Sequence, residues 1–174
     1  ASARALALPD AYTTEIGLVA HAFVSSVASM LERGIALFID YGFPRAEYYH
    51  PQPRSGTLMC RYRHRAHSDP FFLPGLQDIT AHVDFTAMAE AAHAAGADVL
   101  GYATQAQFLI NCGLTEVMGR VSPEDTRRYA PLAGAANTLT SPAEMGELFK
   151  VLAFGRGVAA PLAGFRAGDK RHTL

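Results

Sequence analysis

A carboxylate and a phenol follow directly on an apolar stretch of the sequence. The run Ile35 to Ile39 contains only apolar residues, and Asp40 and Tyr41 come straight after it. In open parallel α/β sheets ligands bind at the carboxyl ends of the strands, so both side chains are candidates for a site. Further polar aromatic residues follow: Tyr48, Tyr49 and His50. The alternative is structural, with Asp40 capping a turn and the tyrosines packed with their hydroxyl groups in water.

A second candidate is the cluster of positive charge between Cys60 and His67. Its charged and titratable members are Arg61, Arg63, His64, Arg65 and His67. Such a cluster in a nearly neutral protein is suited to bind phosphate, carboxylate or RNA. The alternative is a solvated basic arm of a loop.

A metal site is the least favoured interpretation of this region. The possible ligands are Cys60, His64, His67 and His82. Their spacing, C-x3-H-x2-H, matches no strong zinc pattern, and the neighbouring arginines would oppose a cation. We therefore expect no metal site.

The segment "QDITAHVD" places polar residues at alternate positions. If it is extended, Asp78, Thr80, His82 and Asp84 lie on one side of it. Asp84 precedes an alanine-rich segment and is expected to cap a helix. Asp78 and His82 are candidates for acid–base or substrate-orienting groups. A hydrogen-bonded structural role for His82 is the alternative.

One motif match is misleading. Gly155-x-Gly157-x-x-Ala160 follows a predicted strand and fits the glycine pattern of dinucleotide-binding folds. Pro161 and Gly164 interrupt the helix that should follow, so we reject it as a nucleotide site.

Periodicity predicts the elements that position these residues. Apolar residues recur at helical spacing from Thr13 to Arg33, and Gly34 then ends the helix. The apolar run 35–39 is typical of an interior strand in a parallel sheet that is covered on both sides. The long segment 43–77 has no helical period, and "SGTLMCRYRHR" within it allows a strand or hairpin arm.

The second half of the chain alternates helices and strands. We expect a helix over 85–95, a second parallel strand in "ADVLGYAT", and a helix that ends at Gly113. Ser122-Pro123-Glu124 should open another helix, Ser141 to Glu144 should form a capping box around a short one, and "LFKVLAFGRG" should be the closing strand. The pattern predicts an α/β fold with a doubly wound sheet.

Composition limits the classes of protein that fit. The length of 174 residues suits a single domain, 1–174, and 49% hydrophobic residues suffice for a core. The net charge of −1 gives the chain no overall electrostatic attraction to nucleic acid or to an anionic membrane, so we expect neither as a partner. Cys60 and Cys112 lie far apart, which indicates free thiols in a reducing compartment. No apolar run reaches the length of a membrane-spanning helix. The opening residues "ASARALALPD" contain no initiator Met, so we expect part of a longer protein.

A long stretch of the sequence resembles a known family. The motifs IDYG, GTL, YRHRAH, DPF, GLQDITAHVDF and QAQFL, together with "LPDAYTTEI", are similar to the MidA family of S-adenosylmethionine-dependent methyltransferases. The resemblance implies a Rossmann-like class I methyltransferase fold, of which this chain is the later, C-terminal half with 43–77 as an inserted arm. It also implies S-adenosyl-L-methionine as cofactor, an arginine of a protein as substrate, and the N-terminal half of the same enzyme as partner. Mitochondrial members assist complex I assembly, so we expect a cytoplasmic location in bacteria and a mitochondrial one in eukaryotes.

The resemblance assigns no residue roles, so these follow from chemistry and position. Asp40 or Asp78 would orient the arginine and accept its proton, while Tyr41 and His82 position it. The expected substrate-binding residues are Tyr48, Tyr49, His50, Arg61, Arg63, His64 and His67. The glycine-rich cofactor loop is not in this sequence, so we expect the chain alone to bind the cofactor weakly or not at all. Two alternatives are a non-catalytic module that binds protein or RNA through the basic arm, and a metal-dependent hydrolase.

Overall fold

The computed structural model describes residue 8, residues 11–50 and residues 56–174. The helices are α1 (Leu18–Met30), α2 (Arg45–Tyr48), α3 (Phe85–Ala94), α4 (Gln105–Asn111), α5 (Leu114–Met118) and α6 (Thr126–Thr140), with the short 3-10 helices η2 (Ala163–Phe165) and η3 (Arg171–Thr173). The strands are β1 (Gly34–Phe43), β2 (Met59–Tyr62), β3 (Arg65–His67), β4 (Asp78–Thr80), β5 (Val83–Asp84), β6 (Asp98–Thr104) and β7 (Phe149–Arg156). None of the helices in these ranges is long and apolar enough to cross a membrane.

The main sheet has the strand order β5-β1-β7-β6. β7 pairs antiparallel with β1 on one side and with β6 on the other, whereas β5 pairs parallel with the end of β1 at Gly42 and Phe43. β1 and β6 therefore run parallel to each other, as predicted, but β7 separates them. Close approach of backbones requires Gly42, since a Cβ there would lie 2.2 Å from the carbonyl oxygen of Val83.

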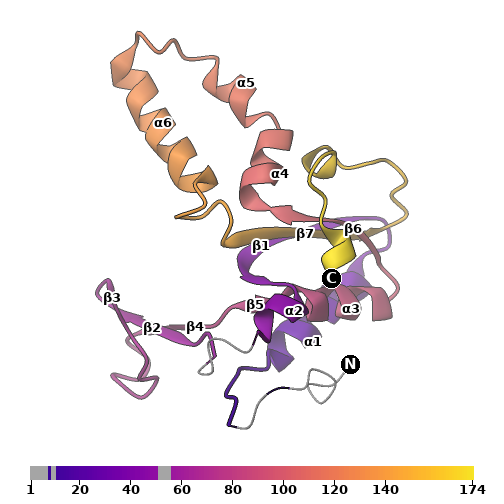
Figure 1. Cartoon of the computed structure of the whole chain (residues 1–174). Helices are drawn as coiled ribbons and strands as arrows, with labels where there is room; N and C mark the ends of the chain where they lie inside the picture. Colours follow the sequence, from indigo (N-terminus) through magenta and orange to yellow (C-terminus); the bar gives the residue numbers. More distant parts are fainter. Residues whose placement is uncertain (1–7, 9–10, 51–55) are drawn as a thin grey trace.

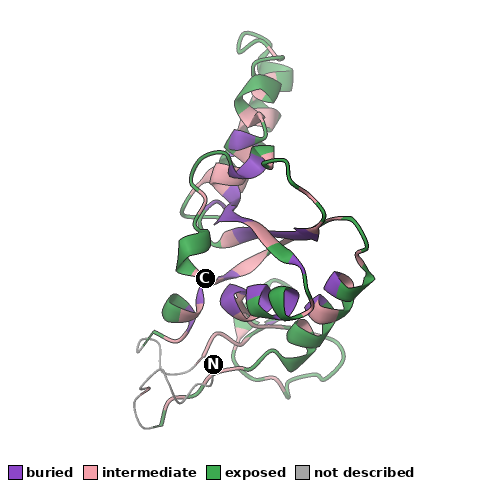
Figure 2. Ribbon diagram, turned by 90° about the vertical axis from the view of Figure 1, so that its right-hand side faces the viewer, coloured by how far each residue is buried: buried purple, intermediate pink, exposed green. Residues whose placement is uncertain are grey.

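Helices cover the two faces of this sheet unequally (Figure 1). α1 and α3 pack on one face, where Val24, Phe85, Leu152 and Phe154 form the fully buried core. On the other face α4 and η2 pack over β6 and β7, with Phe108 and Phe165 5.3 Å apart. Figure 2 shows the buried residues concentrated on the sheet and on the helix faces that touch it.

The run 35–39 was predicted to be buried on both faces of its strand. This prediction is wrong, since among the described residues only one face of the strand is covered. Ala36 and Phe38 pack against the core, but Ile35, Leu37 and Ile39 remain 42%, 45% and 51% exposed. A continuous apolar run shows that both faces of a strand suit burial, but not what covers them. No described element covers this second face.

The predicted helix starts are partly correct. Asp84 caps α3 as expected, because its Oδ1 accepts a hydrogen bond from the amide of Ala87 at 3.0 Å. The helix predicted from Ser122 begins at Thr126 instead, because Asp125 caps it and the Ser122 hydroxyl accepts from Glu124 in a preceding turn. The short helix predicted around Ser141 to Glu144 is absent, and these described residues form turns.

A small second sheet forms the arm, defined here as residues 56–82. Its strand order is β3-β2-β4, with both pairs antiparallel. The predicted hairpin is thus confirmed as β2 and β3, and β4 adds a third strand. Figure 1 shows the arm extending away from the main sheet on the side of β5.

Candidate functional site

A cavity of about 970 Å³ lies between the arm and the main sheet. The sheet side contributes Tyr41 and Phe149, and the arm contributes Thr57, Arg61, Asp78 and His82. Tyr41 reaches the cavity because it stands near the carboxyl end of β1, where the topology brings the arm back to the sheet through β5. Three of the four residues predicted to be catalytic, Tyr41, Asp78 and His82, therefore line one cavity.

His82 lies at the junction of the arm and the sheet. Its ring packs edge-on between Tyr41, with the ring centroids 5.5 Å apart, and Phe43, at 5.2 Å. Its backbone N–H donates to the Thr57 hydroxyl at 2.9 Å. Burial lowers the pKa of His82 below its ordinary value, against the smaller opposing effect of Glu15, so the imidazole is neutral near pH 7. Its Nδ1 is buried and has no hydrogen-bond partner among the described residues.

Glu15 fixes the base of the arm, a role that sequence reasoning missed. Its carboxylate accepts hydrogen bonds from the amides of Thr57 at 3.0 Å and Leu58 at 2.9 Å, and from the Thr57 hydroxyl at 3.2 Å. Gly56 has a φ of +75°, and a Cβ there would lie 2.3 Å from Glu15 Oε1, so the carboxylate takes the space of a side chain. Burial alone would raise the pKa of Glu15, but the amide hydrogen bonds outweigh it and the pKa is lowered.

Lys150 is a second residue near the site that the sequence did not single out. It is buried, its Nζ lies 5.3 Å from the ring centroid of Phe43, and it donates to the carbonyl oxygen of Glu147. Burial lowers its pKa below the ordinary value. Its charge lowers the pKa of His82 in turn, which helps to keep that imidazole neutral. Its position in an apolar strand, "FKVLAF", was the available signal.

Asp40 stands next to the cavity but does not belong to its lining. Within β1, its Oδ1 accepts a hydrogen bond from the amide of the next residue, Tyr41, at 2.8 Å. Tyr41 itself packs edge-on against Phe149, with centroids 5.5 Å apart. The catalytic role predicted for Asp40 stays a prediction.

The tyrosines predicted to bind substrate lie beside a different, smaller cavity of about 290 Å³. Tyr48 is buried, and burial raises its pKa to about 12; burial also raises the pKa of Tyr49. Next to them Arg45 pairs with Glu90, with N–O distances of 2.7 and 2.5 Å. Glu15 lines this smaller cavity, and His82 lines both cavities, so the two meet at His82.

The remaining predicted residues spread over the surface. His50 is exposed behind α2, where its carbonyl oxygen accepts from the Tyr12 hydroxyl at 3.1 Å. Arg61 lines the large cavity, whereas Arg63 and His67 line a separate pocket on the arm. His64 is exposed in the hairpin turn with a φ of 65°.

No group of three or more His, Cys, Asp or Glu side chains suited to a metal occurs within residues 8, 11–50 and 56–174. Cys60 is buried and Cys112 is exposed, and both are free thiols.

The described residues do not fit the cofactor loop of a Rossmann-like fold either. Gly155 lies within β7, where a Cβ would come 2.4 Å from the carbonyl oxygen of Gly34, so this glycine allows close strand pairing. After Gly157 the chain continues in bends and η2, with no helix at the motif. The motif therefore lacks the helix that a dinucleotide site requires, and we assign no cofactor contact to this chain.

The comparisons with known proteins identify the family. Residues 1–103 match the family model described as "Putative S-adenosyl-L-methionine-dependent methyltransferase". The chain is 32% identical over 155 residues to the mitochondrial "Protein arginine methyltransferase NDUFAF7 homolog" of Drosophila melanogaster, and 33% identical over 139 residues to the NDUFAF7 protein of Danio rerio. These alignments cover 82% and 78% of this chain, but only 33% and 30% of those relatives.

Solved structures agree with this assignment. A Burkholderia thailandensis protein solved with S-adenosyl-homocysteine bound is 56% identical and superimposes with a TM-score of 0.95 over 98% of this chain. A second crystal structure from the same organism is 58% identical, with a TM-score of 0.93 over 94% of this chain. The chain spans 44% of the length of each of these proteins. The predicted Rossmann-like fold and the predicted cofactor of the family, S-adenosylmethionine, are thereby confirmed. The chain belongs to the MidA family of S-adenosylmethionine-dependent methyltransferases.

Proposed function

We propose that this chain is the C-terminal part of an S-adenosylmethionine-dependent methyltransferase that modifies an arginine side chain of a protein. The names of the Drosophila melanogaster and Danio rerio relatives, both protein arginine methyltransferases, support the choice of substrate. In this proposal the chain contributes the side of the active site that receives the arginine, and the preceding part of the enzyme contributes the cofactor loop.

The observation that carries the proposal is the cavity that Tyr41, Asp78 and His82 share. A guanidinium needs a carboxylate for charge pairing and an aromatic face for stacking, and Asp78 and Tyr41 offer these. Methylation replaces one N–H of the guanidinium, so a proton must leave. The neutral imidazole of His82, which lines the cavity, is suited to accept that proton.

The free edge of β1 supports the division of the enzyme into two parts. Residues Gly34 to Tyr41 pair with β7 on one edge, and no described strand pairs with the other. Ile35, Leu37 and Ile39 on the same strand are exposed. In our proposal the N-terminal half of the enzyme extends the sheet at this edge and buries these residues.

The test measures methyl transfer by the full-length protein. Labelled S-adenosylmethionine is supplied with cell extract as the source of protein substrates, and the proteins are hydrolysed to identify the modified amino acid. The expected product is methylarginine. Label on lysine, on a small molecule, or on nothing would contradict the proposal.

Matched variants test whether the cavity is the site. His82→Asn should lower methyl transfer by about 100-fold or more, the usual range for loss of a positioned proton acceptor. The control is His93→Asn, which changes an exposed histidine of α3 and should leave activity unchanged. Equal activity of the two variants would remove His82 from the mechanism.

Calorimetric titration tests the two-part arrangement independently. The full-length protein should bind S-adenosylmethionine, and the 174-residue chain alone should bind it weakly or not at all. Comparable affinity of the two would show that this chain holds the cofactor by itself.

A further inference from the structure

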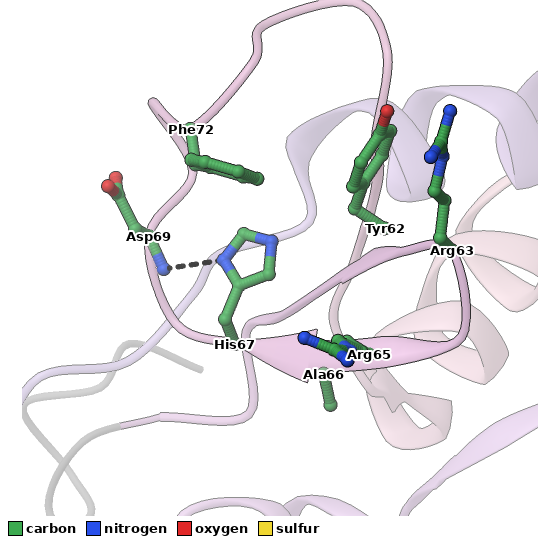
Figure 3. A pocket seen from close by; sticks show the side chains of 7 residues that line it. All are labelled: Tyr62, Arg63, Arg65, Ala66, His67, Asp69 and Phe72. Carbon is green, nitrogen blue, oxygen red and sulfur yellow. Dashed lines mark hydrogen bonds between the residues drawn. The ribbon is translucent and has the colours of Figure 1, made fainter.

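The arm carries a pocket of its own, separate from the cavity at His82. The pocket has a volume of about 820 Å³, and its side chains come from the β2–β3 hairpin and the turn after it. They are Tyr62, Arg63, Arg65, His67, Asp69 and Phe72 (Figure 3). None of these residues takes part in the proposed proton transfer, so the pocket needs a separate explanation.

Aromatic rings form one side of the pocket. His67 and Phe72 meet edge-to-face with ring centroids 5.2 Å apart, and Tyr62 and Phe72 do so at 6.0 Å. Edge-to-face contacts of this kind leave ring faces open to an apolar group. In Figure 3 the three rings lie side by side, with His67 between Phe72 and Tyr62.

His67 presents a hydrogen-bond donor that lacks an acceptor. Its Nδ1 accepts from the amide of Asp69 at 3.3 Å, so the neutral ring carries its proton on Nε2. This Nε2 is buried and has no partner in the described part of the chain. Figure 3 shows it directed into the space between Tyr62 and Phe72. A buried donor without an acceptor is costly, so a ligand oxygen that displaces the covering side chains and accepts from Nε2 would stabilise this site.

Two guanidinium groups flank the same space. The Arg63 Cζ lies 5.4 Å from the ring centroid of Tyr62, and Arg65 stands on the adjacent strand. Neither arginine forms an ion pair with another described residue. The carboxylate of Asp69 does not neutralise them, because its Oδ1 accepts from the amide of Phe71 at 2.9 Å and points away from the pocket in Figure 3.

We propose that the arm pocket binds an acidic side chain of the protein substrate together with an apolar neighbour of that side chain. The carboxylate pairs with Arg63 and Arg65 and accepts from His67 Nε2, while the apolar group contacts Tyr62 and Phe72. This inference rests on the proposed protein substrate. It adds a specificity element: the enzyme selects arginines that have an acidic residue in reach of the arm.

The position of the pocket fits a single substrate segment that contacts both sites. Neighbouring residues of a strand face opposite sides, and along β2 Arg61 lines the large cavity whereas Tyr62 lines the arm pocket. A peptide that crosses the edge of the arm would therefore reach both. A protein segment suits the surroundings better than RNA does, because the loop between β3 and β4 exposes the apolar residues Phe71 and Leu76 and the net charge of the chain is −1.

The test uses two dye-labelled peptides and the full-length protein without cofactor. One peptide is Gly-Ser-Arg-Gly-Ser-Leu-Glu-Leu-Gly-Ser, and the other has Gln in place of Glu. Fluorescence anisotropy should give a dissociation constant about tenfold lower for the Glu peptide, as charge-assisted hydrogen bonds usually provide. Equal affinities would overturn the proposal.

Variants assign the preference to the pocket. The double change Arg63→Gln and Arg65→Gln should abolish the preference for Glu, and His67→Asn should reduce it, since Asn keeps an acceptor for Asp69 but cannot donate as Nε2 does. The control, Arg120→Gln with Arg127→Gln, removes two exposed arginines near α5 and α6 and should keep the preference. Thermal unfolding of each variant checks folding. A preference that persists in the folded double variant would overturn the proposal.

Two further measurements distinguish a failure of the pocket proposal from a failure of the proposed methyltransferase function. A dye-labelled single-stranded RNA that binds more tightly than the Glu peptide, and loses binding in the double variant, would make the pocket an RNA site and overturn the proposal. Methyl transfer is measured on the same preparations. Transfer without a preference for Glu would overturn the pocket alone, whereas a preference without transfer would support the pocket and contradict the proposed function.

Discussion

The main sheet and the arm are both antiparallel for the most part, yet different interactions stabilise them. In β7 the residues Val151 to Phe154 are fully buried between helices on both faces. In the arm only Cys60 is fully buried among the strand residues, and Met59 and Ile79 remain exposed. The main sheet is therefore held by apolar burial.

Polar contacts replace this burial in the arm. Glu15 fixes its base, the Thr80 hydroxyl donates to the carbonyl oxygen of Met59 at 3.1 Å, and the Gln77 amide donates to the carbonyl oxygen of Pro70 at 2.9 Å. Such hydrogen bonds fix the backbone of the arm but do not cover its surface. The arm thus keeps basic and apolar side chains exposed, whereas the side chains of β7 are covered on both faces.

The largest effect should come from the core of the main sheet. Phe154→Ala removes a fully buried ring that stacks on Phe38 at 5.4 Å, and large-to-small changes at such sites cost about 3–5 kcal/mol of unfolding free energy. The matched change in the arm, Phe71→Ala, affects a ring that is 83% exposed and should stay within about 0.5 kcal/mol. Urea unfolding of both variants tests this contrast, and similar losses would show that the arm is as tightly packed as the sheet.

The next largest effect should be on turnover, and it tests whether the arm supplies the carboxylate that we propose to bind the substrate. Asp78→Asn in the arm should lower methyl transfer by about 10- to 100-fold, because it removes the charge-assisted bond that we propose to the substrate guanidinium. Asp98→Asn, at the exposed start of β6, is the control and should be neutral. Turnover per folded full-length enzyme is the measurement. Normal turnover of the Asp78 variant would exclude the arm as the source of this charge.

Glu15→Gln should loosen the arm and leave the main sheet unchanged. The side-chain amide of Gln has one acceptor oxygen and cannot accept from both Thr57 and Leu58 as the two carboxylate oxygens do. Hydrogen exchange of these two backbone amides should therefore become about tenfold faster, which corresponds to the lower end of the free energies measured for hydrogen bonds to charged groups. Hydrogen exchange in β7 should stay constant. Glu32→Gln changes an exposed residue and serves as control. Faster exchange in both sheets would mean that Glu15 acts on the whole fold.

The same contact should make the arm sensitive to acid. Because the folded pKa of Glu15 lies below its ordinary value of 4.5, the stabilisation is fully present above that pH. It is lost as the pH falls through the lowered pKa. Protection factors of the Thr57 and Leu58 amides should therefore be constant from neutral pH down to the ordinary value and then decline. A decline that begins near neutral pH would implicate another group.

The smallest effect should come from Asp40 in the main sheet. Asn at this position keeps an acceptor oxygen for the amide of Tyr41, so Asp40→Asn should lower turnover by only about threefold and leave thermal unfolding nearly unchanged. A loss as large as that of Asp78→Asn would support the catalytic role predicted for Asp40 from the sequence, and would place the substrate-binding carboxylate on the sheet and not on the arm.

Local patterns were sufficient for much of the fold. The helix α3, its cap at Asp84 and its end near Gly96 depend on residues within one or two turns of one another, so the sequence predicts them directly. The hairpin of β2 and β3 follows from alternation in "SGTLMCRYRHR", and the long run of family motifs identified the methyltransferase fold. Tyr41 was recognisable as a candidate because polar residues at strand ends in α/β folds often line sites, and Asp78 and His82 because polar residues alternate in "QDITAHVD".

The tertiary structure alone decided which of these residues meet. Glu15 binds amides that are 42 and 43 positions later in the chain, and Lys150 reaches Phe43 only because β7 inserts beside β1. Because helices cover only part of the sheet, Ile35, Leu37 and Ile39 remain exposed although their sequence suits burial. Local propensity acts over a few residues, whereas burial, pKa shifts and cavities depend on contacts between distant segments, and these exist only once the chain has folded.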